Sequence, residues 1–252
     1  MSFKRLRRKI MAAHDCRKAI QSIRELEYQL PSARSRFAVP FVFKGKRIFR
    51  SIRPSQTPLE IEGLYERVLE LSPKRLLEIG TNRGGTLYLW IQAAAEDAKI
   101  VSVDLPEGQF GGGYIVNRVP FYESFARPNQ ELKLLRADSH LVETRDIVLD
   151  SFDQEQIDFL FIDGDHTYEG VKDDFSLYSP LVRPGGLVVF HDILPNPNDT
   201  HIQVAPFWDQ IKEQFDIEEL IWTNNKGLKI GIGLLWVPNE GLNSGSLAGG
   251  YG

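Results

Sequence analysis

The apolar residues from Arg75 onward fall into short runs that alternate with segments of helical periodicity. Runs of this length are typical of buried strands, and they occupy residues 75–79, 99–103, 132–135, 157–162 and 186–190. Two more strands are predicted at residues 217–222 and 229–236. Strands that alternate with helices form βαβ units with right-handed crossovers. The pattern therefore predicts an α/β protein whose seven-stranded, mostly parallel sheet is flanked by helices.

The region before the first strand has a different pattern. Apolar residues recur at helical spacing through residues 1–30, and Pro31 ends this predicted helix. Residues 41–49 alternate between apolar and polar and turn at Gly45, which predicts a small hairpin. Thr57 and the proline after it begin a helix that runs to about Leu71.

These patterns divide the chain into three segments. Residues 1–56 form a small N-terminal helix and hairpin extension, and residues 57–237 form the main domain. Residues 238–252 are rich in Gly, Ser and Asn, so we expect them to form a flexible C-terminal tail.

Composition narrows the class of protein. With 42% hydrophobic and 25% charged residues the chain resembles an ordinary globular enzyme, and its net charge of −4 provides no overall field for a nucleic acid. Cys16 is the only cysteine, which excludes an internal disulfide and favours the cytoplasm. No stretch reaches the length of a transmembrane helix.

One basic cluster stands at the start of the chain. It consists of Lys4, Arg5, Arg7, Arg8 and Lys9. The simpler interpretation is a solvated helix face; the alternative is peripheral contact with a membrane surface or with a partner.

Candidate chemistry follows the predicted strands, because ligands of open parallel sheets bind beyond the carboxyl ends of the strands. After the first strand, Gly80 allows a tight turn, and Gly84 and Gly85 allow a ligand to approach the next helix. Asp104 follows the second strand, 24 positions after Gly80, which suits a carboxylate that binds ribose hydroxyls. A glycine turn with a later acid also describes NAD-binding folds.

The third strand leads into Asp138 and Ser139, which are placed to bind an adenine edge. The fourth strand leads into Asp163 and His166, and the fifth into His191 and Asp192. Carboxylates from neighbouring strands repel each other unless a cation or a shared proton intervenes, which favours a divalent metal. Its predicted ligands are Asp163, Asp192 and His191, and His166 is a candidate general base.

Simpler roles remain open for these residues. The aspartates can cap the helices that follow them, and a single histidine is often structural or exposed, as we expect for His14, His140 and His201. Two loops, at residues 108–114 and 192–201, are candidate lids or substrate walls. We expect three aromatic residues to line an acceptor pocket, namely Phe110, Tyr114 and Tyr168. We expect three others to pack in or near the core, namely Trp90, Trp208 and Trp222.

Four motifs together resemble the class I S-adenosylmethionine-dependent methyltransferases. They are Glu78-Ile-Gly80-Thr81-Asn-Arg-Gly84-Gly85-Thr86, Asp104, Phe161-Ile-Asp163-Gly-Asp165-His166-Thr-Tyr168, and Pro184-Gly-Gly-Leu-Val-Val-Phe-His191-Asp192. The match is to the branch of macrolide-sugar O-methyltransferases and cephalosporin hydroxylase-like proteins, and it covers residues 75–237. Four motifs in the same order are more specific than one.

The resemblance implies a Rossmann-like fold and the cofactor S-adenosylmethionine. Within the first motif, Glu78, Gly80, Thr81, Gly84, Gly85 and Thr86 are the implied cofactor-binding residues, with Glu78 and Gly80 near the methionine part. It places Asp104 on the ribose and Asp138-Ser139 at the adenine, and it adds Asp163 to the cofactor and catalytic residues.

The resemblance also implies Mg²⁺, held by Asp163 and by an acidic pair after the fifth strand, but this chain has His191-Asp192 there. Imidazole is a poor ligand for Mg²⁺ and a better one for Mn²⁺, Fe²⁺ or Zn²⁺. Three alternatives follow: Mg²⁺ bound through Asp163, Asp192 and water, which we prefer; a softer metal; or a metal-free site with His191 or His166 as base.

The expected function is O-methylation of a small-molecule or sugar hydroxyl, with vicinal diols as the best fit because a metal can orient both oxygens. Two other enzyme classes stay open, an NAD-dependent oxidoreductase and a non-haem-iron oxygenase that uses His166, His191 and an aspartate. A third alternative is a cofactor-binding assembly subunit. By analogy with the branch we expect a homo-oligomer without a nucleic-acid partner.

Overall fold

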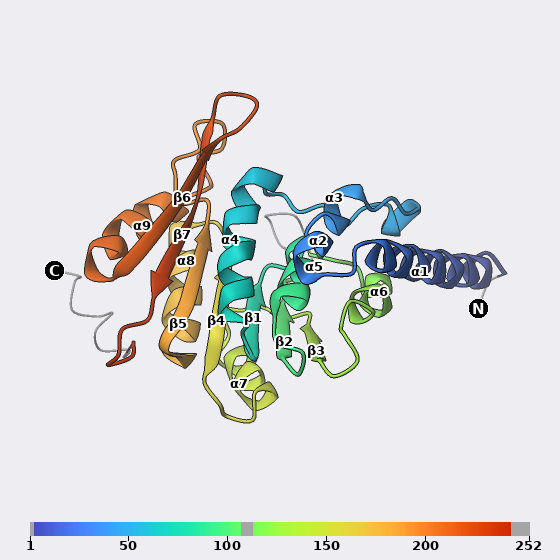
Figure 1. Cartoon of the computed structure of the whole chain (residues 1–252), viewed down its shortest axis with the longest axis horizontal. Helices are drawn as coiled ribbons and strands as arrows, with labels where there is room; N and C mark the ends of the chain where they lie inside the picture. The colour runs from blue at the N-terminus through green and yellow to red at the C-terminus, as the bar shows by residue number, and fades with distance from the viewer. Residues whose placement is uncertain (1–2, 107–112, 243–252) are drawn as a thin grey trace.

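The computed structural model describes residues 3–106 and 113–242, and its centre is a seven-stranded sheet of order β3-β2-β1-β4-β5-β7-β6 (Figure 1). The first five strands are mutually parallel, whereas β7 runs antiparallel to β5 and β6 antiparallel to β7. The strands are β1 (Arg75–Ile79), β2 (Lys99–Val103), β3 (Glu131–Leu135), β4 (Ile157–Ile162), β5 (Val182–His191), β6 (Asp216–Thr223) and β7 (Lys229–Trp236). The predicted α/β sheet and its seven strands are confirmed.

Helices cover both faces of this sheet (Figure 1). The α-helices are α1 (Phe3–Gln29), α2 (Ala33–Arg36), α3 (Val39–Val42), α4 (Pro58–Leu71), α5 (Gly85–Ala93), α6 (Val119–Glu123), α7 (Val142–Ser151), α8 (Tyr168–Tyr178) and α9 (Val204–Ile211). Helices α1, α3, α4, α5 and α6 contribute to one hydrophobic cluster, and α7, α8 and α9 contribute to the cluster on the opposite face. No helix among those described is both long and apolar enough to span a bilayer.

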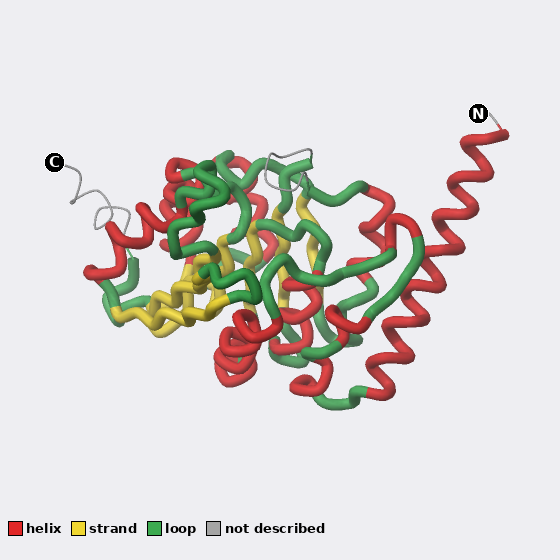
Figure 2. The backbone as a smooth tube through the Cα atoms, turned by 90° about the horizontal axis from the view of Figure 1, so that it is seen from above, coloured by secondary structure: helices red, strands yellow, loops and turns green. Residues whose placement is uncertain are grey.

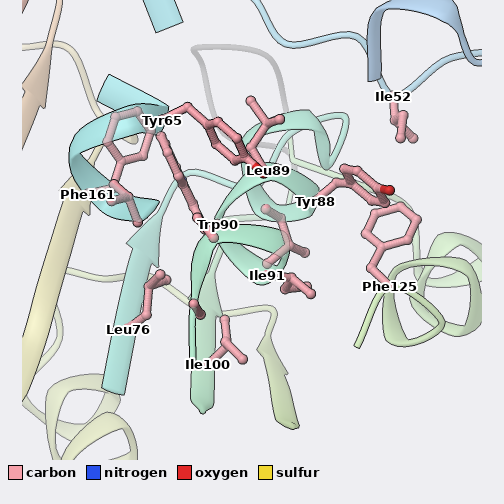
Figure 3. Close-up of a cluster of buried hydrophobic side chains, with 14 of the residues drawn as sticks. Ile52, Tyr65, Leu76, Tyr88, Leu89, Trp90, Ile91, Ile100, Phe125 and Phe161 are labelled. Atoms are coloured by element: carbon pink, nitrogen blue, oxygen red, sulfur yellow. The ribbon is translucent and has the colours of Figure 1, made fainter. Parts of the chain in front are cut away.

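Alternation along the buried strands divides their side chains between the two clusters. In β1, Leu76 joins the cluster with α5, while Leu77 joins the cluster with α7 and α8. Figure 3 shows the first cluster, in which Trp90 of α5 lies above the sheet and its ring centroid is 5.2 Å from that of Phe161. Successive residues of a strand point to opposite faces, so both faces of β1 are buried and β1 can hold a site at its carboxyl end rigidly.

Helix α4 begins where the sequence predicted. Thr57 caps it, since the Thr57 hydroxyl accepts a hydrogen bond from the backbone N–H of Glu60, and the Glu60 carboxylate accepts one from the N–H of Thr57. This reciprocal capping box, followed by Pro58, fixes the first turn of the helix. The consequence for function is that the side chain of Glu60 is held at the start of α4.

The N-terminal helix α1 runs obliquely along one end of the molecule and extends past it (Figure 2). Its middle and C-terminal parts are anchored, because Cys16, Ala19 and Ile23 are buried in the same cluster as α5. The Tyr88 hydroxyl also donates a hydrogen bond of 3.2 Å to Glu27. The predicted first helix is therefore confirmed.

Two predictions about elements are wrong. Residues 41–49 do not form a hairpin: helix α3 and the short 3₁₀ helix η1 (Arg47–Phe49) occupy this region. Pro40 favours a helical turn at α3 and provides no N–H for a strand ladder. The aromatic rings pack separately, with the ring of Phe49 5.5 Å from that of Phe121.

The predicted packing of Trp222 in or near the core is also wrong. Trp222 is 38% exposed near the end of β6, because β6 is the edge strand of the sheet.

Candidate functional site

A cavity of about 650 Å³ lies at the carboxyl ends of β1 to β5. Most of its lining residues lie at the ends of these five strands or in the turns that follow them, which is where open parallel sheets bind ligands. They include Gly80, Asn82, Asp104, Asp138, Ser139, Asp163, Asp165, His166, His191 and Asp192. One cavity thus brings together residues as distant in the sequence as Gly80 and Asp192, which are 112 positions apart.

The turn after β1 depends on Gly80. Its φ angle is +99°, which favours glycine, and a Cβ atom there would lie 2.0 Å from the backbone oxygen of Asp163. The missing side chain therefore lets the ends of β1 and β4 approach each other. This confirms the predicted tight turn and explains how Asp163 comes to line the same cavity.

Gly84 and Gly85 are not among the residues that line the cavity, and their role in cofactor binding stays a prediction. A Cβ on Gly84 would meet the ring of Tyr122 at 2.6 Å, and a Cβ on Gly85 would meet the backbone oxygen of Ile52 at 2.2 Å. Protein atoms of α6 and of the N-terminal extension therefore occupy the space that a side chain at either glycine would need. The glycines allow close packing of these segments against α5.

Glu78, Thr81 and Thr86 are buried behind the cavity rather than in its lining. The Ser102 hydroxyl donates a 2.7 Å hydrogen bond to Glu78 and lies 2.6 Å from the Thr81 hydroxyl. Burial raises the pKa of Glu78 to about 8, although hydrogen bonds from Ser102 and Thr86 act in the opposite direction. Glu78 is therefore mostly protonated at neutral pH and supports the turn from below.

Asp104 lines the cavity at the end of β2. One of its carboxylate oxygens accepts a 3.0 Å hydrogen bond from the backbone N–H of Asn82. Burial raises its pKa to about 6, while backbone N–H groups of Asn82 and Tyr114 partly offset this effect. The neighbouring turn after β3 contributes Asp138 and Ser139, so these three predicted residues lie together.

Two histidines and two aspartates meet on the other side of the cavity. His166 Nδ1 lies 2.9 Å from Asp192 Oδ2, and His166 Nε2 lies 3.7 Å from Asp163 Oδ1. His191 Nδ1 lies 3.0 Å from Asp163 Oδ1 and 3.3 Å from Asp192 Oδ2. Asp192 has a φ angle of +60°, so its backbone adopts an uncommon conformation that turns the carboxylate toward both imidazoles.

The electrostatics of this cluster favour charged groups. Burial acts to lower the pKa of His191, but Asp192 and Asp163 outweigh it and raise the pKa well above its usual value. Burial likewise acts to raise the pKa of Asp192, but His191 and His166 outweigh it and hold the pKa far below the usual value. Asp192 is therefore ionised throughout the physiological range.

Asp163, His191 and Asp192 also fit a metal ion. One ligand atom from each lies within 4.8 Å of the others, and neighbouring ligands of an octahedral ion such as Mg²⁺ are separated by about 3 Å, close to the 3.0 and 3.3 Å observed. Within the described residues, the buried atoms Asp163 Oδ1 and His191 Nδ1 make no hydrogen bond of acceptable geometry. A metal ion would satisfy both atoms by displacing the proton of His191, because only a neutral imidazole coordinates a metal.

Two residues of the site were missed by the sequence analysis. His191 Nε2 lies 3.2 Å from Glu60 Oε1, and the Gln56 side-chain amide donates a 2.9 Å hydrogen bond to Asp163 Oδ2. Thr57 and Pro58 predicted the start of α4 but not the strand end that α4 faces. His140, which we expected to be structural or exposed, also lines the cavity.

The predicted aromatic lining is wrong in two positions. Tyr114 is buried with its ring 5.0 Å from that of Tyr122, and Tyr168 packs on Phe207 at 5.9 Å; neither lines the cavity. Of the two candidate lid loops, residues 108–112 with Phe110 lie outside the described residues, as do the last ten residues of the predicted tail. Gly113 and Asp192 of these loops do line the cavity.

Residues 77–193 match a family model described as a methyltransferase domain. A flavonoid 3',5'-methyltransferase of Vitis vinifera is 27% identical over 135 residues, which are 53% of this chain and 54% of that protein. The chain spans 13%, 16% and 54% of the lengths of three curated relatives that it matches.

Two solved structures share the fold. An O-methyltransferase from Bacillus cereus, in complex with SAH, is 18% identical with a TM-score of 0.54, over 73% of this chain and 84% of that one. The O-methyltransferase TomG from Streptomyces achromogenes, in complex with SAM, is 19% identical with a TM-score of 0.55, over 82% and 89%. The sheet order, the cavity at its carboxyl edge and the match of residues 77–193 to a methyltransferase domain make the chain similar to the S-adenosylmethionine-dependent methyltransferases.

Proposed function

We propose that the protein transfers the methyl group of S-adenosylmethionine to a hydroxyl of a small molecule or sugar. The observation that carries this proposal is the single cavity, which joins Asp104 and Asp138 at one side to Asp163, His166 and His191 at the other. Its volume of about 650 Å³ lies within the range of small-molecule sites. A cofactor and an acceptor can therefore meet inside it.

The cofactor half of the site consists of Gly80, Asn82, Asp104, Asp138 and Ser139. The Asp104 carboxylate is placed to accept hydrogen bonds from ribose hydroxyls, because one of its oxygens already faces the Asn82 N–H and the side chain lines the cavity. Asp138 and Ser139 line the same cavity, which supports the contact with the adenine that the resemblance implies. Gly80 lines the same cavity, and we infer that the methionine part lies beside it.

The acceptor half consists of Asp163, His166, His191 and Asp192. We infer that Asp163, Asp192 and His191 hold a divalent cation, Mg²⁺ or, because of the imidazole, Mn²⁺ or Fe²⁺. When bound, this cation supplies orientation of two neighbouring acceptor oxygens and a lowered hydroxyl pKa. Gln56 and Glu60 position Asp163 and His191 from the start of α4 and the segment before it.

His166 is the proposed general base. Its Nδ1 contact with Asp192 at 2.9 Å fixes the orientation of the ring, and a carboxylate partner raises the basicity of an imidazole. As the acceptor oxygen forms its bond to the methyl carbon, the carbon–sulfur bond breaks and S-adenosylhomocysteine leaves. The hydroxyl proton passes to His166, so atoms and charge balance.

Several finer expectations remain predictions. A match to the branch of macrolide-sugar O-methyltransferases would favour sugar diols as acceptors. A homo-oligomeric state, peripheral membrane contact by the basic start of α1 and a cytoplasmic location are likewise proposals that rest on the sequence alone.

Isothermal titration of the metal-stripped protein tests the cofactor. We expect micromolar binding of S-adenosylmethionine, its loss in Asp104→Ala, and no binding of NAD. Transfer of a labelled methyl group to a panel of sugar diols and catechols, with Mg²⁺, Mn²⁺ or Fe²⁺ added in turn, tests the reaction. Binding of NAD in place of S-adenosylmethionine, or Fe²⁺-dependent oxygen consumption without methyl transfer, would overturn the proposal in favour of the two rival enzyme classes.

A further inference from the structure

A second hollow, of about 310 Å³, lies beside the turn between β1 and α5. It is lined by Arg47, Ile48, Arg50, Ser51, Arg83 and Arg118, so four of the six lining residues are arginines and none is acidic. We call this group the arginine hollow. Three chain segments that are distant in sequence contribute to it, namely η1 with the residues that follow it, the β1–α5 turn, and the 3₁₀ helix η2 (Val116–Arg118).

The positive charge of the arginine hollow is poorly compensated. Arg47 is 3.4 Å from Asp15, but within the described residues Arg50, Arg83 and Arg118 form no salt bridge. Like charges that lie close together repel one another. The surrounding sequence adds to this imbalance, because residues 1–56 contain fifteen of the 30 Lys and Arg residues but only three of the 34 Asp and Glu residues.

Arg118 is held rigidly at the centre of this arrangement. It donates hydrogen bonds to the backbone oxygens of Ser51 at 2.9 Å and Arg83 at 3.3 Å, and its guanidinium lies over the ring of Tyr122 at 5.1 Å. Its buried Nε atom has no hydrogen-bond partner among the described residues. Burial, together with the charge of Arg83, lowers the pKa of Arg118, so the structure maintains this cation in an unfavourable environment.

We propose that the arginine hollow binds the phosphate group of a soluble phosphate ester or diphosphate. Guanidinium groups form paired, charge-assisted hydrogen bonds with phosphate oxygens, and the hollow offers several of them without a competing carboxylate. The main cavity is unsuited to the same ligand, because its lining carries Asp104, Asp138, Asp163, Asp165 and Asp192. This proposal does not depend on the proposed methyl transfer.

A bound phosphate would connect the N-terminal extension to the main domain. Arg47 and Arg50 lie in the extension, whereas Arg83 follows Asn82, which lines the main cavity. The anion would therefore neutralise the repulsion between these segments and hold residues 47–51 against the β1–α5 turn. Since ligands that bind only the folded state stabilise it, we expect phosphate compounds to raise the midpoint of thermal unfolding.

Pyrophosphate is the probe for the first test. It is titrated calorimetrically, in EDTA at constant ionic strength, into the full chain and into the variants Arg50→Gln and Arg83→Gln. We expect saturable binding to the wild type and dissociation constants at least about tenfold higher in each variant, because one charge-assisted contact is lost. Arg17→Gln is the matched control, since it removes the same charge from an exposed position on α1.

Arg118 is unsuitable as a first variant, because its loss would also remove two backbone contacts. Circular dichroism spectra equal to that of the wild type establish that Arg50→Gln and Arg83→Gln are folded. Equal weakening in Arg17→Gln, or no binding by the wild type, would overturn the proposal. Vesicles of phosphatidylserine test whether the phosphate belongs to a lipid headgroup. Retention of the protein on these vesicles that depends on Arg50 and Arg83, without pyrophosphate binding, would overturn the assignment to a soluble ligand.

Discussion

Asp104 shows how a residue that we propose to bind the cofactor can oppose folding. Its carboxylate is largely buried and accepts a backbone hydrogen bond, yet burial still raises its pKa to about 6 from the usual value of 3.8. The ionised form is thus less favourable in the folded apoprotein than in the unfolded chain. Hydrogen bonds from the hydroxyls of a bound ribose would relieve this penalty. The carboxylate that lowers the stability of the apoprotein would therefore raise its affinity for the cofactor.

The affinity for S-adenosylmethionine should therefore depend on pH through Asp104. Below about pH 6 the carboxyl group is protonated, so we expect the dissociation constant to rise toward tenfold for each further pH unit. Calorimetric titrations between pH 5 and pH 8 measure this dependence. In Asp104→Asn the affinity should be weak at every pH, and a variant that retains the wild-type pH profile would contradict the assignment.

The stability of the apoprotein should respond in the opposite sense. Between pH 4 and pH 6 the folded state binds more protons at Asp104 than the unfolded state does, so this residue lowers the free energy of unfolding as pH rises through that window. Above pH 6 the penalty is complete. Urea titrations should show a shallower fall for Asp104→Asn than for the wild type across the same interval.

Glu60 should act on a metal through His191. Its Oε1 atom lies 3.2 Å from His191 Nε2, while His191 Nδ1 faces Asp163 and Asp192. A carboxylate behind a ligating imidazole orients it, and loss of such a partner costs about 10- to 100-fold in metal affinity. We expect this loss for Mn²⁺ in Glu60→Gln, measured by titration of the metal-stripped protein.

The matched control is Glu62→Gln, because Glu62 is exposed on the same helix. The amide side chain in Glu60→Gln would still provide an oxygen for the cap on Thr57, so α4 should remain folded and S-adenosylmethionine should bind as in the wild type. Equal Mn²⁺ affinities in the two variants would show that Glu60 does not position His191.

The difference between Asp163 and Glu60 explains what could be predicted about the site. Asp163, like Asp104 and Asp192, directly follows a strand whose end the apolar pattern located within one residue. Glu60 and Gln56 precede the sheet, and their contacts join residues 107 to 131 positions apart. No local pattern encodes such a contact, since it depends on how α4 packs over the completed sheet.

At the scale of elements, the β1–α5 turn shows a similar division. Its three glycines predicted that another group lies close to the backbone of this turn. The structure confirms that other protein atoms lie close to all three. The identity of the neighbour was predictable only in part: Gly80 lies against the backbone at Asp163, but Gly84 and Gly85 lie against Tyr122 and Ile52. The wrong hairpin at residues 41–49 has the same origin, because tertiary packing overrides local alternation.

Gly85→Ala should destabilise the protein. A Cβ at Gly85 would lie 2.2 Å from the Ile52 backbone oxygen and 2.6 Å from Pro54, so the segment that covers α5 must move. We expect a loss of about 1–3 kcal/mol in the free energy of unfolding, measured by urea denaturation.

Gly63→Ala in α4 provides the comparison. Its Cβ would meet only the Leu220 side chain, at 3.3 Å, and alanine favours a helix by up to about 1 kcal/mol over glycine. Stability should change little or rise slightly. Equal destabilisation by both substitutions would mean that segment 52–54 is not held against α5 in solution.

For the whole molecule, the hydrophobic cores decide whether residues 1–56 are an independent unit. Ile23 of α1 and Phe49 of η1 belong to the same continuous cluster as Leu76 of β1 and Trp90 of α5. Proteins with one continuous core usually unfold in one cooperative step. The division at residue 56 therefore separates two patterns in the sequence, and we expect both parts to unfold together.

Ile23→Ala tests this cooperativity. Ile23 is 1% exposed in the shared core, and truncation of a buried isoleucine costs about 2–5 kcal/mol. If the extension and the main domain form one unit, circular dichroism and the fluorescence of the four tryptophans should both shift to the same lower urea midpoint. Ile10→Ala, at a position that is 59% exposed, should change the free energy of unfolding by less than about 0.5 kcal/mol. A separate early transition in Ile23→Ala, seen by circular dichroism but not by tryptophan fluorescence, would instead mean that α1 can detach while the main domain stays folded. Fluorescence distinguishes these outcomes because all four tryptophans lie in the main domain, Trp90 in α5, Trp208 in α9, Trp222 in β6 and Trp236 in β7.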